Sequence, residues 1–235
     1  MLTRRHFCCS GLIASSLLTF DRAVAAGSCA VPTRDLQAAL TPDEALANLK
    51  DGNARFLSGS TINCDLLKQV HATSSGQFPS AVVIGCIDSR VPPELVFDQR
   101  IGDIFSARVA GNVVNDDIVG SCEFATKLSG ARLIVVLGHS ECGAIKGAID
   151  GAELGELTQL LAKIKPAVKA CNDEPGDHTS KNKAFVQQVA IANAKLAAEN
   201  LTKTSGVLRD LVAEKQLGIV AAMHDIATGR VTFLE

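Results

Sequence analysis

Three largely apolar runs stand out in the middle of the chain, at 81–86, 104–109 and 132–137. A continuous apolar run of this length is typical of a strand that is buried on both faces of a parallel sheet. Residues 116–128, between the second and third runs, have the spacing of a helix. Strands that alternate with helices in this way predict βαβ units and an α/β fold.

The segment before the first predicted strand begins with a helix signal. Thr41 can cap a helix, and Glu44 completes a capping box with it. An apolar stripe follows, so we expect an amphipathic N-terminal helix over 41–57. The next segment, 59–79, is rich in Ser, Thr, Gly and Asn and predicts an irregular connection with one short helical piece near Leu66.

The C-terminal half shows two further helical segments, at 154–170 and 181–201. Strand-like residues at 217–222 and 230–234 flank a turn at 225–229, which predicts a hairpin. The expected fold class is therefore α/β, with a mostly parallel central β-sheet flanked by helices, an N-terminal helical arm and a C-terminal strand or hairpin.

The first 25 residues are interpreted separately, as an export signal. Arg4 and Arg5 precede an apolar run over 8–20, and small residues follow. This run is shorter than the roughly 20 residues that span a bilayer, so we expect a twin-arginine signal peptide over 1–25 and no permanent membrane span. The expected location is periplasmic or secreted, as for an exported bacterial protein.

No repeat, low-complexity tract or long linker divides the remaining chain. We expect a linker over 26–40 and a single catalytic domain over 41–235.

Composition and charge exclude several classes of protein. Hydrophobic residues make up 47% of the chain and charged residues 20%, which excludes a disordered protein. The 23 basic and 25 acidic side chains give a formal charge of −2, so we expect no nucleic acid partner. The chain has no Trp and no Tyr, so its chemistry cannot depend on a tyrosine proton donor or a tryptophan ring.

The eight cysteines do not predict a small disulfide scaffold. Two of them belong to the predicted signal, and the others are spread widely from Cys29 to Cys171. Cys122 lies on a helical stretch and is expected in the core. Cys29, Cys64 and Cys171 could pair in an oxidising compartment, and the sequence does not say which of them do.

Three of the other residues suggest a metal site. Cys86 closes the first apolar run, and His139 and Cys142 follow the third. The carboxyl ends of parallel strands meet at one edge of a sheet, so these side chains are expected to converge. Two thiolates and one imidazole leave a fourth tetrahedral position open, as catalytic zinc sites do. The sequence therefore predicts one Zn²⁺ per subunit.

Asp88 and Arg90 follow Cys86 on the loop that leaves the predicted strand. Arg90 can hold Asp88 in a bidentate pair, which keeps the carboxylate ionised and off the metal. Two thiolates offset the charge of Zn²⁺, so the metal lowers the pKa of its bound water less. Another group near the metal must compensate for this. Asp88 could accept a hydrogen bond from zinc-bound hydroxide, or could bind the zinc and close the site if the pair broke.

Four motifs, taken in order, resemble the β-class carbonic anhydrases. They are the segments 86–94, 102–105, 108–112 and 138–143. The resemblance covers roughly Thr41 to the C-terminus and implies that the three predicted ligands bind zinc and that Asp88 and Arg90 form a gating pair. It also implies reversible hydration of CO₂ to bicarbonate and a proton, by attack of zinc hydroxide, in a homodimer or homotetramer that commonly exchanges its N-terminal helix.

Two subgroups of that family differ near the first cysteine. The plant-like subgroup has a substrate-binding glutamine nine residues before it, and Gln77 stands at that spacing. The other subgroup traps bicarbonate with a tryptophan three residues before the cysteine, where this chain has Val83, and with a distant tyrosine. We therefore expect the plant-like site, with Gln77 and Gly143 as substrate contacts.

Some roles stay open at the level of sequence. Gly111 and Asn112 could form only a turn, or could bring backbone close to the pocket. The tyrosine of the plant-like site is missing, so proton delivery to buffer has no assigned residue. His71, His178 and His224 are interpreted as surface or hydrogen-bonded residues, any of which could carry protons.

Two alternative functions remain beside CO₂ hydration. A hydrolase of carbonyl sulfide or carbon disulfide could use the same scaffold, because these linear substrates require the same nucleophile. A non-catalytic zinc-binding or thiol-redox protein is the second alternative, although redox proteins favour a Cys-x-x-Cys pair, which this sequence lacks.

Overall fold

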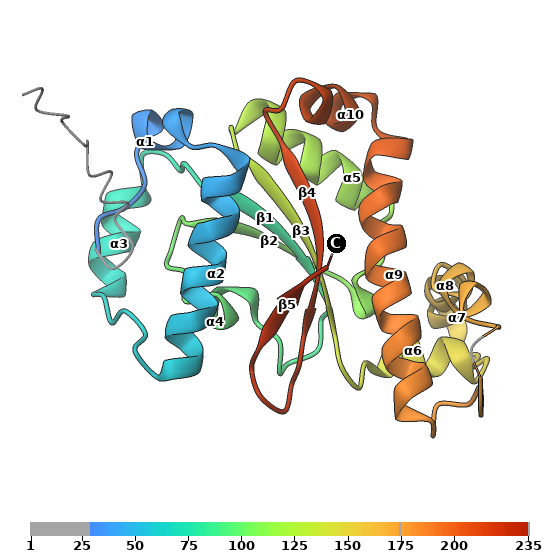
Figure 1. The fold of residues 1–235 in the computed structure, drawn as a ribbon. Helices are drawn as coiled ribbons and strands as arrows, with labels where there is room; N and C mark the ends of the chain where they lie inside the picture. The colour runs from blue at the N-terminus through green and yellow to red at the C-terminus, as the bar shows by residue number, and fades with distance from the viewer. Residues whose placement is uncertain (1–28, 174, 235) are drawn as a thin grey trace, which may run out of the picture.

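A five-stranded sheet forms the centre of the computed structural model, which describes residues 29–173 and 175–234 (Figure 1). The strands lie in the order β2-β1-β3-β4-β5; the first four are parallel and β5 is antiparallel to β4. Their bounds are β1 Ala81–Gly85, β2 Ile104–Arg108, β3 Leu133–His139, β4 Gly218–His224 and β5 Val231–Phe233. The predicted mostly parallel α/β fold and the C-terminal hairpin are confirmed. The predicted signal peptide, 1–25, lies outside the described residues.

Helices cover both faces of this sheet, with α2 on one side and α5, α9 and α10 on the other (Figure 1). The helices of the described residues are α1 Arg34–Ala39, α2 Pro42–Ser58, α3 Leu66–Thr73, α4 Pro93–Val96, α5 Asp116–Glu123, α6 Gly143–Ile149, α7 Gly155–Ala162, α8 Lys165–Ala170, α9 Lys183–Thr204 and α10 Gly206–Ala213. Within the described part of the chain, no helix combines the length and the apolarity needed to cross a bilayer.

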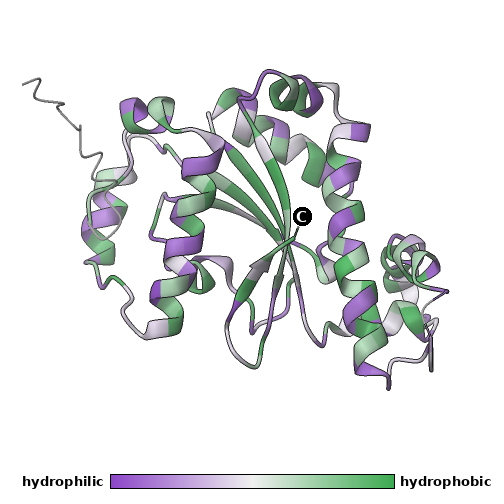
Figure 2. Cartoon of the chain, viewed as in Figure 1, coloured by the Kyte–Doolittle hydropathy of each residue, from purple (hydrophilic) through white to green (hydrophobic). Residues whose placement is uncertain are grey.

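The sheet separates two hydrophobic cores, because alternate side chains of a strand point to opposite faces. Val82 and Ile84 of β1 belong to the core that contains Val189 of α9. Val83 belongs to the other core, together with Leu49 of α2. All residues of β1 are buried, which explains its continuous apolar run. Figure 2 shows apolar strands between helices whose polar residues lie mainly on their outer faces.

Helix α2 begins and ends where its residues predict. The Thr41 side chain accepts a hydrogen bond from the Glu44 amide, and the Glu44 carboxylate accepts one from the Thr41 amide at 2.8 Å. Gly59 ends the helix with a φ of 69°, a left-handed conformation that costs glycine little. The predicted amphipathic helix and the short helical piece near Leu66 are both confirmed.

Two segments differ from the expected elements. The expected linker contains α1, which is held by buried Gln37: its side-chain amide donates to the carbonyls of Pro79 and Ser129, at 2.7 Å each. The single helix expected over 154–170 is instead α7 followed by α8. Pro166 explains this break, because proline lacks an amide hydrogen and suits the first turn of a new helix.

The structure settles part of the cysteine pairing. Cys29 and Cys64 form a disulfide, which ties the segment before α1 to the connection between α2 and α3. Cys171 is buried at the end of α8. Cys122 is fully buried on α5, as its helical position predicts.

Candidate active site

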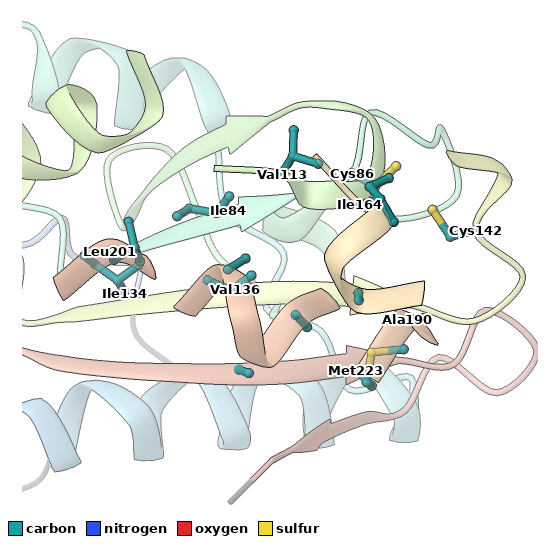
Figure 3. Close-up of a cluster of buried hydrophobic side chains, with 14 of the residues drawn as sticks. Ile84, Cys86, Val113, Ile134, Val136, Cys142, Ile164, Ala190, Leu201 and Met223 are labelled. Carbon is teal, nitrogen blue, oxygen red and sulfur yellow. The ribbon is translucent and has the colours of Figure 1, made fainter. Parts of the chain in front are cut away.

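Three buried side chains converge where β1 and β3 end. Cys86 follows β1, His139 is the last residue of β3, and Cys142 immediately precedes α6. One nitrogen and two sulfur atoms of these residues lie within 4.8 Å of one another. In Figure 3 the sulfur atoms of Cys86 and Cys142 lie close together beyond the ends of the strands. The predicted convergence of the three ligands is confirmed.

The local chain geometry explains this convergence. β1 and β3 are parallel neighbours, with Gly85 opposite Leu137, so both chains leave the sheet at the same edge. After His139 the chain turns sharply, and Glu141 has a φ of 57°, which is uncommon for a residue with a side chain. This turn brings Cys142 back toward Cys86 before α6 begins.

The cluster fits a metal ion. His139 Nδ1 lies 2.9 Å from the Ser140 carbonyl oxygen, and this hydrogen bond assigns the ring proton to Nδ1. The other ring nitrogen, Nε2, is buried and has no hydrogen-bond partner among the residues that the structure describes. A buried polar atom without a partner costs free energy, which a metal ion at this position would recover. Two sulfurs and one imidazole are a donor set that suits Zn²⁺.

The Cys86 and Cys142 side chains shift each other's pKa in opposite directions. Cys142 hydrogen-bonds to Cys86, and this bond is the main reason why the pKa of Cys86 falls to about 4. The same bond, together with burial, raises the pKa of Cys142. Cys86 thus provides a ready thiolate, and a bound metal would displace the proton that Cys142 retains.

Asp88 and Arg90 form a close pair beside the cluster. The Arg90 guanidinium donates to both carboxylate oxygens of Asp88, at 2.9 and 2.7 Å, and the Arg90 amide adds a third hydrogen bond at 3.0 Å. These bonds hold the pKa of the Asp88 carboxyl well below its usual range. Among the described residues, the cluster of possible metal ligands contains Cys86, His139 and Cys142 and does not include this carboxylate.

Comparisons with known proteins agree with this geometry. A family model described as carbonic anhydrase matches residues 81–231. A carbonic anhydrase of Mycolicibacterium smegmatis is 33% identical over 196 residues, which cover 81% of this chain and 92% of that protein. The chain belongs to the β-class carbonic anhydrases. A tetrameric β-carbonic anhydrase of Sordaria macrospora has a similar structure, with a TM-score of 0.64 and 27% identity over 71% of this chain and 89% of the other.

A second solved structure shares the fold at lower identity. It is a β-carbonic anhydrase of Aspergillus fumigatus, with a TM-score of 0.65 and 24% identity over 82% of this chain and 90% of that one. The family match spans all five strands of the sheet except the end of β5. It therefore includes both strand ends that carry the metal cluster.

Sequence reasoning missed Arg108, although it lies in one of the motifs of the β-carbonic anhydrases. Its guanidinium extends from the end of β2 and donates to the carbonyl oxygens of Cys86 and Asp88, at 2.9 and 2.7 Å. Arg108 thereby fixes the backbone that carries both a ligand and the acidic member of the pair. The available signal was a charged residue within the otherwise largely apolar run 104–109.

The structure does not bring Gln77 to the cluster within one chain. Gln77 is exposed and precedes β1, whereas Cys86 follows it, so the length of the strand, about 17 Å, separates them. Gly143 lies beside the cluster as the first residue of α6 and is exposed, with open space where a side chain would begin.

His224 differs from its expected surface or hydrogen-bonded position. It lies opposite His139 at the end of β4 and is 3% exposed. Neither ring nitrogen has a hydrogen-bond partner among the described residues, and burial lowers the pKa of this histidine. Sequence reasoning missed this burial because the predicted strand ended at residue 222, whereas β4 continues to His224 and its last four residues are buried.

Proposed function

We propose that this chain catalyses the reversible hydration of CO₂ to bicarbonate and a proton, with one Zn²⁺ held by Cys86, His139 and Cys142. The observation that carries this proposal is a buried cluster of two sulfurs and one nitrogen without a carboxylate ligand. This arrangement leaves a coordination position for water, as catalytic zinc sites do. A bound Zn²⁺ supplies the Lewis acidity that makes water a nucleophile near neutral pH.

Zinc content and stopped-flow CO₂ hydration, measured on the same purified sample, test this function. We expect about one zinc per chain and rapid hydration. Negligible hydration by zinc-loaded protein would contradict the proposal. If that protein released sulfide rapidly from carbonyl sulfide, the chain would instead be a hydrolase of that substrate.

Asp88 is the proposed acceptor of a hydrogen bond from the zinc-bound hydroxide. The Arg90 guanidinium donates a hydrogen bond to each carboxylate oxygen of Asp88 and keeps the carboxylate ionised. If the pair is lost, Asp88 becomes free to bind the metal and to fill the position that water requires. Replacing Arg90 with methionine should therefore exchange the water ligand for a carboxylate oxygen of Asp88, which a crystal structure of the zinc-loaded variant would show. An unchanged zinc environment in that variant would argue against the gating role.

The plant-like substrate site requires a second copy of the chain. Gln77 lies at the opposite end of β1 from Cys86, so it could reach substrate only in a partner's active site. Exposed apolar side chains, such as Leu66 and Leu67 on α3, support a contact between copies. The similar protein of Sordaria macrospora is tetrameric. A homodimer or homotetramer is therefore part of this proposal.

Mixing two inactive variants tests the shared site directly. Gln77→Ala and Asp88→Asn should each have little activity as pure oligomers. In a mixed dimer, the Gln77→Ala chain keeps Asp88 and receives Gln77 from its partner, so one site is complete. Random reassembly should then restore roughly a quarter of the parent's sites. No recovery, in a mixture shown by mass spectrometry to contain mixed dimers, would refute the role of Gln77 across the interface.

Export to the periplasm or the medium is the last part of the proposal. The Cys29–Cys64 disulfide supports it, because disulfides persist mainly in oxidising compartments. Cell fractionation should find the processed chain outside the cytoplasm. Replacing Arg4 and Arg5 with lysine should retain the unprocessed chain inside, because the twin-arginine signal is lost. Unchanged export of that variant would exclude this route.

A further inference from the structure

The Cys86 sulfur contacts a turn whose role the sequence leaves open. The Gly111 amide donates a hydrogen bond to Cys86 Sγ, with a nitrogen to sulfur distance of 3.3 Å. The carbonyl of the same Gly111 accepts a hydrogen bond from Asn193 Nδ2 at 2.8 Å. Both bonds are buried. A single residue of the turn therefore links helix α9 to a metal ligand.

The Gly111 position admits no side chain. Gly111 has a φ of 68°, and a Cβ atom there would lie 2.6 Å from Ile164 Cδ1 and 3.2 Å from Ala144 Cβ. The turn is also tied to the sheet, because the Val109 amide donates to the Gly85 carbonyl at 3.1 Å. Packing and hydrogen bonds thus hold this backbone close to Cys86 from several sides.

Asn193 is an unusual residue for its place in α9. It is 5% exposed, and the neighbouring buried positions of the helix are apolar, including Val189, Ala190, Ala194 and Ala197. Burial of an amide at such a position is unfavourable unless the group is hydrogen-bonded. If the position served only to pack the helix, an apolar residue would suffice. The hydrogen bond to the Gly111 carbonyl therefore explains why an asparagine stands there.

We propose that Asn193 is a positioning residue of the metal centre, which holds the Gly111 amide against the Cys86 sulfur. This inference rests on the proposed function, since it concerns the metal that the cluster would hold. A hydrogen bond to a thiolate withdraws charge from its sulfur, and such bonds tune metal sites that contain cysteine. The bond therefore offsets part of the charge that two thiolates donate, so that a bound metal stays more acidic.

Asn193→Leu and a matched control, Asn53→Leu, test the inference. Asn53 is also a buried asparagine on a helix, where its amide donates to the carbonyls of Val96 and Gly229, at 2.9 and 3.0 Å, away from the cluster. Each variant is loaded with Zn²⁺ for competition against a chelator, and with Co²⁺ for absorption spectroscopy. Urea unfolding of the metal-free proteins measures the loss of stability in each.

We expect Asn193→Leu to weaken zinc binding about 10- to 100-fold, the range for loss of such supporting contacts. The sulfur to cobalt charge-transfer band should move to longer wavelength, because the sulfur becomes richer in electrons. Asn53→Leu should lower stability and leave both readouts unchanged. If Asn193→Leu does not fold, Asn193→Ala removes the same donor without adding bulk and should cause the same two changes.

Two results would overturn the inference. One is a band position and zinc affinity in Asn193→Leu, or in Asn193→Ala if that variant replaces it, that match the parent protein. The other is an equal shift of both readouts in Asn53→Leu. Failure of the proposed function is a different outcome, because it would appear in the parent chain itself, either as no binding of Zn²⁺ or Co²⁺ or as negligible CO₂ hydration by the zinc-loaded protein.

Discussion

Replacing both Cys29 and Cys64 with serine should lower the stability of the fold without changing the metal site. The disulfide joins residues that are 35 positions apart, so it closes a long loop in the unfolded chain. The chain-entropy relation gives about 4 kcal/mol for a loop of this length. At roughly 2–4 °C per kcal/mol for a domain of this size, the melting temperature should fall by about 8–15 °C.

Thermal unfolding of the double variant and of the oxidised parent, each loaded with zinc, measures this change. Reductant provides the control, because it should lower the melting temperature of the parent and leave the variant unaffected. Zinc content should stay the same, since none of the hydrogen bonds described around Cys86, His139 and Cys142 involves residues 29–64. A fall of less than about 2 °C would show that the unfolded chain does not gain the expected entropy, and loss of zinc would show that the two regions are coupled.

Three further predictions concern single side chains. Asp88→Asn should reduce CO₂ hydration at least about 100-fold in stopped-flow assays and retain zinc, whereas a non-catalytic zinc protein would show no such loss. Arg108→Met should lower the free energy of unfolding in urea by about 1–2 kcal/mol, because one part-buried and one exposed carbonyl lose a charged donor; no change would mean that water replaces it. Burial raises the pKa of Cys122 from 9.0 to about 12, so the folded state keeps its proton longer and stability should fall as pH rises through that interval. Cys122→Ala should lack this part of the pH dependence.

The strands and the metal ligands could be predicted because each depends on a local pattern and one general rule. β1 and β3 are buried on both faces, so their apolar runs are continuous and easily recognised. Parallel strand ends meet at one edge, and this places Cys86 near His139 without any knowledge of the helices. The fold class and the metal cluster could therefore be predicted from the amino-acid sequence alone.

The shorter helices could not be predicted because their signals are weak. α4 and α6 begin without a side-chain cap, and α4 is only 4 residues long. Contacts with distant residues fix these helices, and one sequence does not show such contacts. The same limit applies to the site: Asn193 and Arg108 act through backbone groups of residues far away in sequence. Gln77 was predicted from its spacing of nine residues before Cys86. Such a spacing does not show whether a residue serves the active site of its own chain or that of a partner chain.

The two hydrophobic cores described above lie on opposite faces of the sheet and pack separately from each other. Cys86 and Cys142 belong to the core beneath α9, whereas α2 packs into the core on the opposite face of the sheet. The packing of α2 against the sheet is consequently separate from the packing around Cys86 and Cys142, so we expect the amide protons of α2 to exchange with solvent independently of those beneath α9. A partner chain that covered the α2 side would then slow proton exchange there first.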